Sequence, residues 1–446
     1  MDEITYICKR TVVSTKPVEA GKNFPLSVLD RHMEKNHIRM VYYYPSSPPD
    51  QADIGEVTKN LRTSLAETLT FFPIMTGRLI KDEKGHWKVK CNDAGVRMVE
   101  ARAKGSVHHW LKHVNREKEL QLVHWEHMFH KPYFWSTFYA QITEFEEGGF
   151  AIGLSFTHLL ADTTCGTRFM NAWADISSLR KMVAPPLVHP LPPRRLGNKS
   201  PNHRPYTDLI NHYQSSILKP NIISVTEAKY TTISFGFSDE MVRTCMSMVR
   251  APGGPILSPF EALAGLFWVC LSKIKGMDDT GLVDMSICLD VRKALGLDSG
   301  FFGNCTLYNK VRAGDLGKNN KLAQAASAIR EAVSKMDSEG IMDLIEWLED
   351  NDMNCPTMMN GHDVICANIE EVNPYLARFE GEFEPIRVSY YAEPVLGEAQ
   401  VLIMPAPPGE GPLSRVAMLT LRGDEAVKLC EDDLISHLSP TTSMKS

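Results

Sequence analysis

A proline-dense segment near the middle of the chain places the strongest constraint on the fold. Between residues 184 and 205, prolines occur at positions 185, 186, 190, 192, 193, 201 and 205. Proline fixes φ and lacks a backbone N–H, so this density excludes a helix or a central strand and favours an extended, exposed connection. The segment therefore predicts the start of a linker between two halves of the chain. The length of 446 residues is typical of two or three domains.

The first half contains helical and strand-like patterns in succession. Between Ile54 and Leu69 apolar residues recur three or four apart, which predicts a helix with one buried face. Residues 149–158 alternate instead, which predicts a strand that ends at a histidine. The residues that share one side of this strand are Phe150, Ile152, Leu154, Phe156 and His158. Helical spacing resumes after Asp162, so the expected order is strand, short loop, helix.

The second half shows the same mixture. A strand-like run occupies residues 230–237, and residues 388–421 are typical of strands separated by Pro- and Gly-containing turns. Ser258 can cap a helix, with Pro259 at the first helical position and Glu261 completing a capping box. Apolar spacing over residues 322–336 predicts a second helix. Both halves are therefore predicted to be α+β.

Composition excludes several classes of protein. The formal net charge is -6 and the pI is about 6.2, whereas a nucleic-acid-binding protein needs a basic stripe. No stretch approaches the length of a membrane span, and the N-terminus has no apolar region typical of a signal peptide. The ten cysteines include no Cys-x-x-Cys pair and lie mostly in apolar runs, as in a reducing compartment. We therefore expect a cytoplasmic protein with no membrane span and no nucleic-acid partner.

His158 and Asp162 form the main candidate for chemistry. A histidine at a strand end is a plausible general base because its pKa lies near working pH. An aspartate four residues later can cap the next helix or hold the loop. With 15 histidines in 446 residues, this spacing is expected to occur by chance as well. On local grounds, a catalytic histidine and a histidine satisfied within the core remain alternatives.

Other chemistries find less support. Six histidines at 108, 109, 113, 124, 127 and 130 suggest a metal, but their spacing matches no established ligand motif, so we expect none. No Gly-x-Ser-x-Gly elbow occurs, and the glycine pairs lack the spacing and lysine of a phosphate loop.

Six ordered segments together resemble the plant BAHD acyltransferases, also called the His-x-x-x-Asp family. They are residues 26–30 (LSVLD), 71–79 (FFPIMTGRL), 91–101 (CNDAGVRMVEA), 158–162 (HLLAD), 290–292 (DVR) and 300–304 (GFFGN). The resemblance implies an α+β fold of two similar chloramphenicol-acetyltransferase-like domains with an interdomain channel. Residues 1–183 would form the N-terminal acyltransferase domain, 184–225 a Pro-rich crossover linker, and 226–446 the C-terminal acyltransferase domain.

The resemblance also implies a reaction. Acyl-CoA as co-substrate, with no bound cofactor, would meet an alcohol or amine of plant specialised metabolism at His158, the general base of a monomeric, cytoplasmic transferase. Asp162 would support the catalytic loop rather than touch substrate, with Arg292 as its partner. Asn304 and Tyr391 are the expected oxyanion or channel residues.

The sequence departs from the family at the "DFGWGKP" loop, which appears here as residues 388–394 (VSYYAEP). Val388 replaces the aspartate, Tyr390 and Ala392 replace both glycines, and Tyr391 replaces the tryptophan. A left-handed backbone conformation at these two positions would therefore cost more free energy than it does at glycine. The Tyr391 hydroxyl is a candidate donor to an oxyanion.

In lacking this loop the sequence resembles one branch of the family, the ECERIFERUM2-like proteins. That branch implies a second function: a non-catalytic, endoplasmic-reticulum-associated partner of a condensing enzyme in very-long-chain fatty acid elongation for cuticular wax. Residues 368–375 (NIEEVNPY) also resemble the branch, whereas 290–292 and 300–304 retain the pattern of the enzymes. The sequence favours the enzyme because His158 and these second-half segments are present together.

Overall fold

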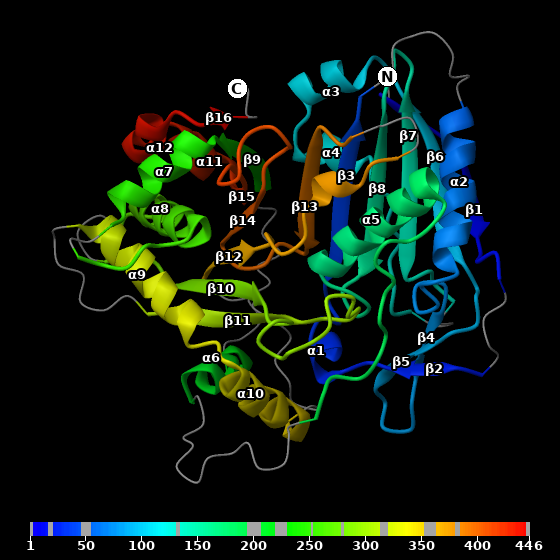
Figure 1. Cartoon of the computed structure of the whole chain (residues 1–446), viewed down its shortest axis with the longest axis horizontal. Coiled ribbons are helices and arrows are strands. Elements are labelled where there is room, and N and C mark those ends of the chain that lie inside the picture. Colours follow the sequence, from blue (N-terminus) through cyan, green and yellow to red (C-terminus); the bar gives the residue numbers. More distant parts are fainter. Residues whose placement is uncertain are drawn as a thin grey trace. The chain divides into compact units, whose positions relative to one another are not determined.

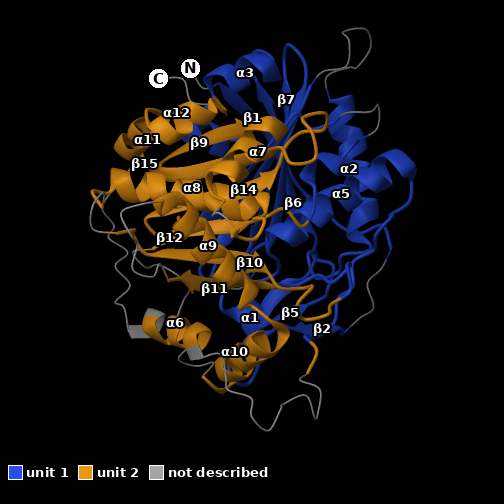
Figure 2. Ribbon diagram, turned by 60° about the vertical axis from the view of Figure 1, so that its left-hand side comes forward, with its two compact units in different colours: residues 1–191, 298–304, 372–394 blue, residues 192–297, 305–371, 395–446 orange. Residues whose placement is uncertain are grey.

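The structure is a computed structural model in which residues 3–16, 21–45, 55–130, 134–193, 207–218, 230–250, 253–277, 281–312, 320–351, 363–379 and 384–442 are described. The chain divides into two compact units (Figure 2). Unit 1 comprises Met1–Leu191, Asp298–Asn304 and Val372–Pro394. Unit 2 comprises Pro192–Leu297, Cys305–Glu371 and Val395–Ser446. Unit 1 therefore takes two segments from the second half of the chain.

Unit 1 is built on a six-stranded sheet (Figure 1). In spatial order its strands are β1 (Ile4–Val12), β6 (Val96–Ala103), β7 (Phe138–Phe145), β8 (Phe150–Thr157), β3 (His37–Tyr44) and β13 (Arg387–Glu393). Only β6 and β7 run parallel; the other pairs are antiparallel. A smaller sheet contains β2 (Asn23–Pro25), β5 (Trp87–Lys90) and β4 (Arg78–Lys81). The strand β13 thus joins the first sheet although it lies far along the chain.

Helices cover both faces of the larger sheet. They are α1 (Val28–Arg31), α2 (Glu56–Leu69), α3 (Val107–His113), α4 (Arg116–Leu120), α5 (Thr163–Leu179) and the 3-10 turn η2 (Pro374–Leu376). On one face α5 approaches so closely that a Cβ at Gly166 would lie 2.6 Å from Met40 Sδ. On the other, Val107 and Trp110 of α3 pack with Val41 and Ala151. The predicted helix up to Leu69 is confirmed as α2.

The strand before His158 is more deeply buried than its alternating pattern suggested. All eight residues of β8 are buried, because β7 and β3 flank the strand and chain covers both of its faces. Gly153 is required here: a Cβ at that position would lie 2.0 Å from Leu122 O. The sequence thus predicted the strand correctly but not the covering of its second face.

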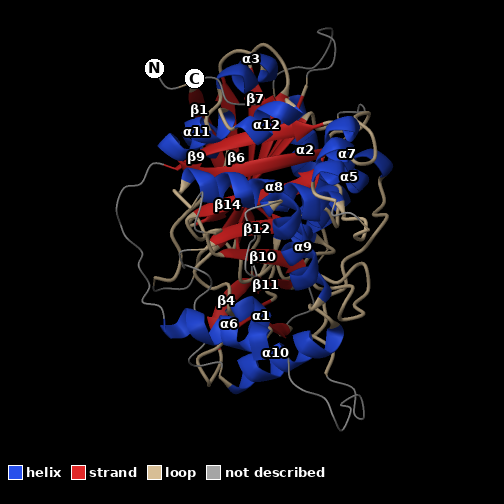
Figure 3. Cartoon of the chain, turned by 90° about the vertical axis from the view of Figure 1, so that its left-hand side faces the viewer, coloured by secondary structure: helices blue, strands red, loops and turns tan. Residues whose placement is uncertain are grey.

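Unit 2 contains a seven-stranded mixed sheet with helices packed against it (Figure 3). Its strands, in spatial order, are β11 (Thr306–Val311), β10 (Met285–Asp290), β12 (Val364–Asn368), β14 (Ala399–Pro405), β15 (Arg415–Arg422), β9 (Tyr230–Phe237) and β16 (Thr441–Thr442). Its helices are α6 (Thr207–Leu218), α7 (Asp239–Met248), α8 (Pro259–Ile274), α9 (Lys321–Ser334), α10 (Ser338–Asp350), α11 (Gly423–Cys430) and α12 (Asp433–Leu438). Both units are therefore α+β, as predicted.

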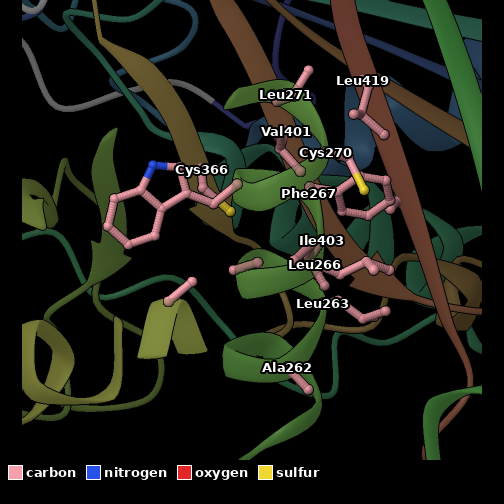
Figure 4. Close-up of a cluster of buried hydrophobic side chains, with 14 of the residues drawn as sticks. Ala262, Leu263, Leu266, Phe267, Cys270, Leu271, Cys366, Val401, Ile403 and Leu419 are labelled. Atoms are coloured by element: carbon pink, nitrogen blue, oxygen red, sulfur yellow. The ribbon is translucent and has the colours of Figure 1, made fainter. Parts of the chain in front are cut away.

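The central helix of unit 2 begins as the sequence indicated. Ser258 is the N-cap of α8 and forms a capping box with Glu261, and Pro259 stands in the first turn. Gly265 lets α8 approach α9, since a Cβ there would lie 2.9 Å from the Cβ of Ala326. Leu263, Phe267 and other α8 side chains pack against the strands β14 and β15 in the core shown in Figure 4.

The proline-dense segment is described only in part. Residues 184–193 form no helix, and Leu187 exchanges backbone hydrogen bonds with Gly300 and Phe302, at 2.8 and 2.9 Å. Residues 194–206 and 219–225 of the predicted linker lie outside the described residues. Between them, α6 begins after the last proline of the segment.

Candidate active site

His158 lies directly after β8, in a short buried loop that leads into α5. Its backbone N–H donates to the Asn36 carbonyl at 2.9 Å, which fixes the end of β8 against the chain entering β3. Leu160 N donates to Thr157 O at 3.1 Å and closes a turn. His158 is only 5% exposed. The loop therefore holds the imidazole in a defined, largely dehydrated environment.

Asn304 determines which ring nitrogen of His158 carries the proton. Its Nδ2 donates to Asp30 Oδ1 at 2.8 Å and to the His158 carbonyl at 2.7 Å. Both partners only accept, so the orientation of the Asn304 amide follows from this network. Asn304 Oδ1 then faces His158 Nδ1 at 2.9 Å and must accept a hydrogen bond from it. His158 is therefore the Nδ1–H tautomer, with its lone pair on Nε2.

Asp30 supports this arrangement from the first turn of α1. Its side chain accepts from Ser27 N at 2.7 Å, while Ser27 Oγ accepts from Asp30 N at 3.1 Å, which completes a capping box. Asp30 Oδ1 also accepts from Asn304 N at 2.9 Å. Burial raises the pKa of Asp30, and the donors from Asn304 and Ser27 oppose that shift. The role of Asp30 was not predicted from the sequence, although the Ser-x-x-Asp spacing of residues 27–30 is typical of a capping box.

The remaining residues of the loop are fixed by the start of α5. Asp162 is the N-cap of α5, and its Oδ1 accepts from Cys165 N at 3.0 Å. Cys165 Sγ in turn contacts Gly303, accepting from its N–H at 3.3 Å. Arg168 Nη1 donates to Phe301 O at 3.0 Å. The segment 300–304 thus lies along the first turns of α5, which brings Asn304 to His158.

The electrostatics of His158 suit a base. Burial lowers its pKa, and Asp162 and the hydrogen bond with Asn304 partly oppose the shift. The imidazole is therefore neutral near neutral pH, with Nε2 able to accept a proton. A neutral histidine of fixed tautomer can deprotonate a hydroxyl or an amine.

The segment that replaces the family's glycine-containing loop forms the strand β13. Val388 and Tyr390 are buried, and neither Tyr390 nor Ala392 has a positive φ. Tyr390 Oη lies 2.9 Å from Thr167 Oγ1 of α5. The Tyr391 hydroxyl donates to the buried carboxylate of Glu119, which also accepts from Ser389 Oγ at 2.8 Å. The extended backbone explains why this segment needs no glycine.

Arg292 forms a local pair in unit 2. Its Nη1 lies 2.5 Å from Asp290 Oδ2, and its backbone N–H donates to Asp290 Oδ1 at 2.9 Å. The predicted pairing of Arg292 with Asp162 involves residues of different units and stays a prediction.

The histidine-rich segment forms side-chain contacts of other kinds. The rings of His109 and His113 are 4.9 Å apart, and His124 Nε2 is 3.2 Å from Glu126 Oε1. In the described part of the chain, no three His, Cys, Asp or Glu side chains are arranged to hold a metal ion. Within the same ranges, no helix combines the length and apolarity that a membrane crossing requires.

A cavity of about 270 Å³ lies in unit 2 between α6, β11 and α9, and His158 is not among the residues that line it. His212 lines it, with Nε2 3.3 Å from Ser286 Oγ. Ser286 donates its hydroxyl proton to Asp363 at 2.8 Å. His212 therefore donates to this serine, which is the opposite of what activation of a serine nucleophile requires. We therefore take His158, and not this cavity, as the candidate active site.

Comparison with known proteins gives one family. The profile of the Transferase family matches residues 2–421. A hydroxycinnamoyltransferase of Narcissus pseudonarcissus is 27% identical over 77% of this chain and 79% of its own length. A shikimate O-hydroxycinnamoyltransferase of Nicotiana tabacum is 26% identical over 75% and 77%, respectively. An ECERIFERUM 26-like protein of Arabidopsis thaliana is 24% identical over 94% and 92%.

Solved structures show the same fold. Vinorine synthase superimposes with a TM-score of 0.70 and 19% identity, covering 97% of this chain and 98% of its own. The TRI101 protein of F. graminearum, complexed with coenzyme A and T-2 mycotoxin, gives a TM-score of 0.68 and 14% identity, covering 95% and 100%. These similarities support the α+β architecture predicted from the sequence.

Proposed function

The chain belongs to the plant BAHD family of acyl-CoA-dependent acyltransferases, and from this we propose that it transfers an acyl group from acyl-CoA to a small-molecule alcohol or amine, with His158 as the general base that deprotonates the acceptor. The observation that carries the proposal is the hydrogen bond between His158 Nδ1 and Asn304 Oδ1 at 2.9 Å. It leaves the lone pair of the imidazole on Nε2, the state that a base requires.

The reaction follows from this tautomer. The acceptor's O–H or N–H proton passes to His158 Nε2 while the acceptor oxygen or nitrogen forms a bond to the thioester carbonyl carbon. The carbon–sulfur bond then breaks, and the imidazolium returns the proton to the sulfur of CoA. The products are an ester or amide and free CoA. A positioned general base typically contributes ~10²–10⁴-fold to such a rate.

Asp162 and Asp30 have supporting roles in this proposal. Asp162 caps α5, and its charge favours the imidazolium that forms during transfer. Asp30 holds Asn304, and Asn304 holds the ring. Neither carboxylate needs to exchange a proton with the substrate. The acceptor is expected to be a plant specialised metabolite.

The test compares wild type with His158→Ala. Each is incubated with a panel of acyl-CoA thioesters and of alcohols and amines, and free CoA and acylated product are quantified by liquid chromatography. We expect acceptor-dependent CoA release by the wild type and a loss of ~10²–10⁴-fold in the variant. His437→Ala, which changes an exposed histidine of α12, is the matched control and should retain the rate.

The ECERIFERUM 26-like relative favours a second candidate, because its match extends over 94% of this chain, against 77% for the hydroxycinnamoyltransferase. In this alternative the protein assists a fatty-acid condensing enzyme and transfers nothing itself. Co-expression with a condensing enzyme tests it. Longer acyl chains in cells that contain either wild type or His158→Ala, without CoA release from either form, would refute the transferase proposal.

A further inference from the structure

A cluster of cationic side chains lies on the same face of β3 and β13, at the end of β3 nearest His158. Arg39 and His37 are alternate residues of β3, and they pair in register with Tyr391 and Glu393 of β13. Arg116 of α4 lies over this pair of strands, with its guanidinium carbon 5.6 Å from the centre of the Tyr391 ring. All of these residues belong to unit 1.

The charges of this cluster do not balance. Arg116 forms an ion pair with Glu393, and Arg387 lies 3.7 Å from Glu119. Arg39 forms no ion pair of its own among the described residues: burial lowers the pKa of Arg39, and the carboxylate that opposes this shift, Glu393, is already paired with Arg116. Burial and nearby cations, including Arg39, lower the pKa of His37 to about 3, so His37 adds no charge at neutral pH. One positive charge is therefore in excess.

Side-chain nitrogen atoms of this cluster also lack hydrogen-bond partners. Nε of Arg39, Nε of Arg116 and Nε2 of His37 are buried, and none has a hydrogen-bond partner within the described ranges. A buried charge or donor without a partner is destabilising. Yet His37 and Arg39 are only partly buried as whole residues, so a small molecule can reach them. Guanidinium groups match the geometry of carboxylates and phosphates.

We propose that Arg39 and Arg116, assisted by His37, bind the carboxylate of the acyl acceptor. The register supports the choice of the acceptor over CoA. His37 pairs with Thr157, the residue before His158, and Arg39 follows two residues, roughly 7 Å, further along β3. The phosphates of CoA lie at the far end of the molecule from its thioester, whereas the acceptor must lie beside the base. This assignment rests on the proposed transferase function.

The His37 ring adds a flat surface to the site. It stacks on Trp125 with ring centroids 4.3 Å apart and an interplanar angle of 5°. The stack fixes the plane of the imidazole, and His37 lies two residues before Arg39 on the same face of β3. An aromatic hydroxy acid therefore suits the site, since its ring can lie against apolar faces while its carboxylate meets the guanidinium groups.

Thermal unfolding tests the site without requiring turnover. Wild type, Arg39→Met and Arg39→Lys are measured with 3-hydroxybenzoate, with its methyl ester, with CoA, and with sodium chloride at equal ionic strength. We expect the acid, and not the ester, to raise the wild-type Tm by roughly 2–4 °C at well above its Kd. Arg39→Met should lose that shift. Arg39→Lys should keep part of it, because lysine retains the positive charge but lacks the two parallel N–H donors of a guanidinium group.

The ligand-free state gives a second readout. Because Arg39 carries the excess charge and Glu393 keeps its ion pair with Arg116, Arg39→Met should unfold at the same or a higher temperature without ligand. Arg243→Met, which removes an exposed arginine of α7, is the control and should keep the wild-type response. Equal shifts with acid and ester, an unchanged acid response in Arg39→Met, or no Arg39-dependent shift would overturn the proposal. An Arg39-dependent shift with CoA alone would also overturn it, because the site would then bind a phosphate of the acyl donor and not the carboxylate of the acceptor.

The same measurement on His158→Ala separates the two proposals. If the anion site is real, this variant keeps the Arg39-dependent shift with 3-hydroxybenzoate even when acyl transfer is lost. If wild type transfers no acyl group yet shows the shift, the transferase proposal and the assignment to an acyl acceptor both fail, and only the carboxylate site itself stands.

Discussion

Replacing Asn304 by alanine should separate positioning of the base from stability of the fold. The change removes three side-chain hydrogen bonds, at 2.7, 2.8 and 2.9 Å, all to buried partners. At about 1 kcal/mol for each bond, with a further cost for the donors and acceptors left buried, the free energy of unfolding should fall by roughly 3–5 kcal/mol. His158 also loses the acceptor that selects its Nδ1–H tautomer. We expect kcat to fall roughly 10–100-fold, less than for His158→Ala.

The assay is acyl transfer at saturating substrate, with denaturant unfolding of the same preparations. Asn309→Ala is the matched control: Asn309 is a buried asparagine of unit 2 whose Nδ2 donates to Ala332 O at 3.1 Å. It should lose stability while retaining kcat. A folded Asn304→Ala protein with the kcat of the wild type would refute the reasoning, because the tautomer of His158 would then not depend on Asn304.

Four further predictions rest on the burial and contacts of individual residues. Because burial lowers the pKa of His158, kcat/KM should stay constant as pH falls through 6.5 and decline only at lower pH; an acidic limb centred above 6.5 would contradict this. Over the same interval the unfolded chain binds protons that the native His158 does not, so the free energy of unfolding should decrease as pH falls. Glu119→Gln should lower the free energy of unfolding, measured in urea, by roughly 2–4 kcal/mol, since the buried Glu119 carboxylate accepts hydrogen bonds from Ser389 and Tyr391. Glu117→Gln, at an exposed position two residues earlier, should change it little. Gly153→Ala should lower Tm markedly, because the added Cβ would lie 2.0 Å from Leu122 O. Gly423→Ala, where the added Cβ would meet open space, should leave Tm unchanged. Equal Tm values for the two variants would contradict the prediction and show that the chain at Leu122 shifts freely.

Local patterns predicted the elements around the site because their causes lie within a few residues. Ser258, Pro259 and Glu261 start α8 through contacts inside one turn, and these are present in the structure. The cap of α5 by Asp162 is equally local and was one of the two roles predicted for that residue. The alternation before His158 located β8, although it could not show that chain at Leu122 covers the second face of the strand.

The partners of His158 were harder to predict because they come from distant parts of the chain. Asn304 was noted as an oxyanion or channel residue, yet its observed contact is with Nδ1 of His158, 146 residues away in sequence. Asp30, which holds Asn304, lies 128 residues before His158 in the sequence. No periodicity links these positions.

By itself, the sequence determined the α+β class, the helix starts and the strand that ends at His158, because capping, spacing and alternation act over one or two turns. Only the tertiary structure decided that β13 joins the sheet of unit 1, that Tyr391 is bonded to Glu119, and that Arg39 has excess charge. Each of these depends on which strands become neighbours, and therefore on hydrogen bonds and charges brought together across hundreds of residues. The position of the proton on Nδ1 of His158 is determined in the same way, by the Asn304 amide and by the Asp30 carboxylate that orients this amide.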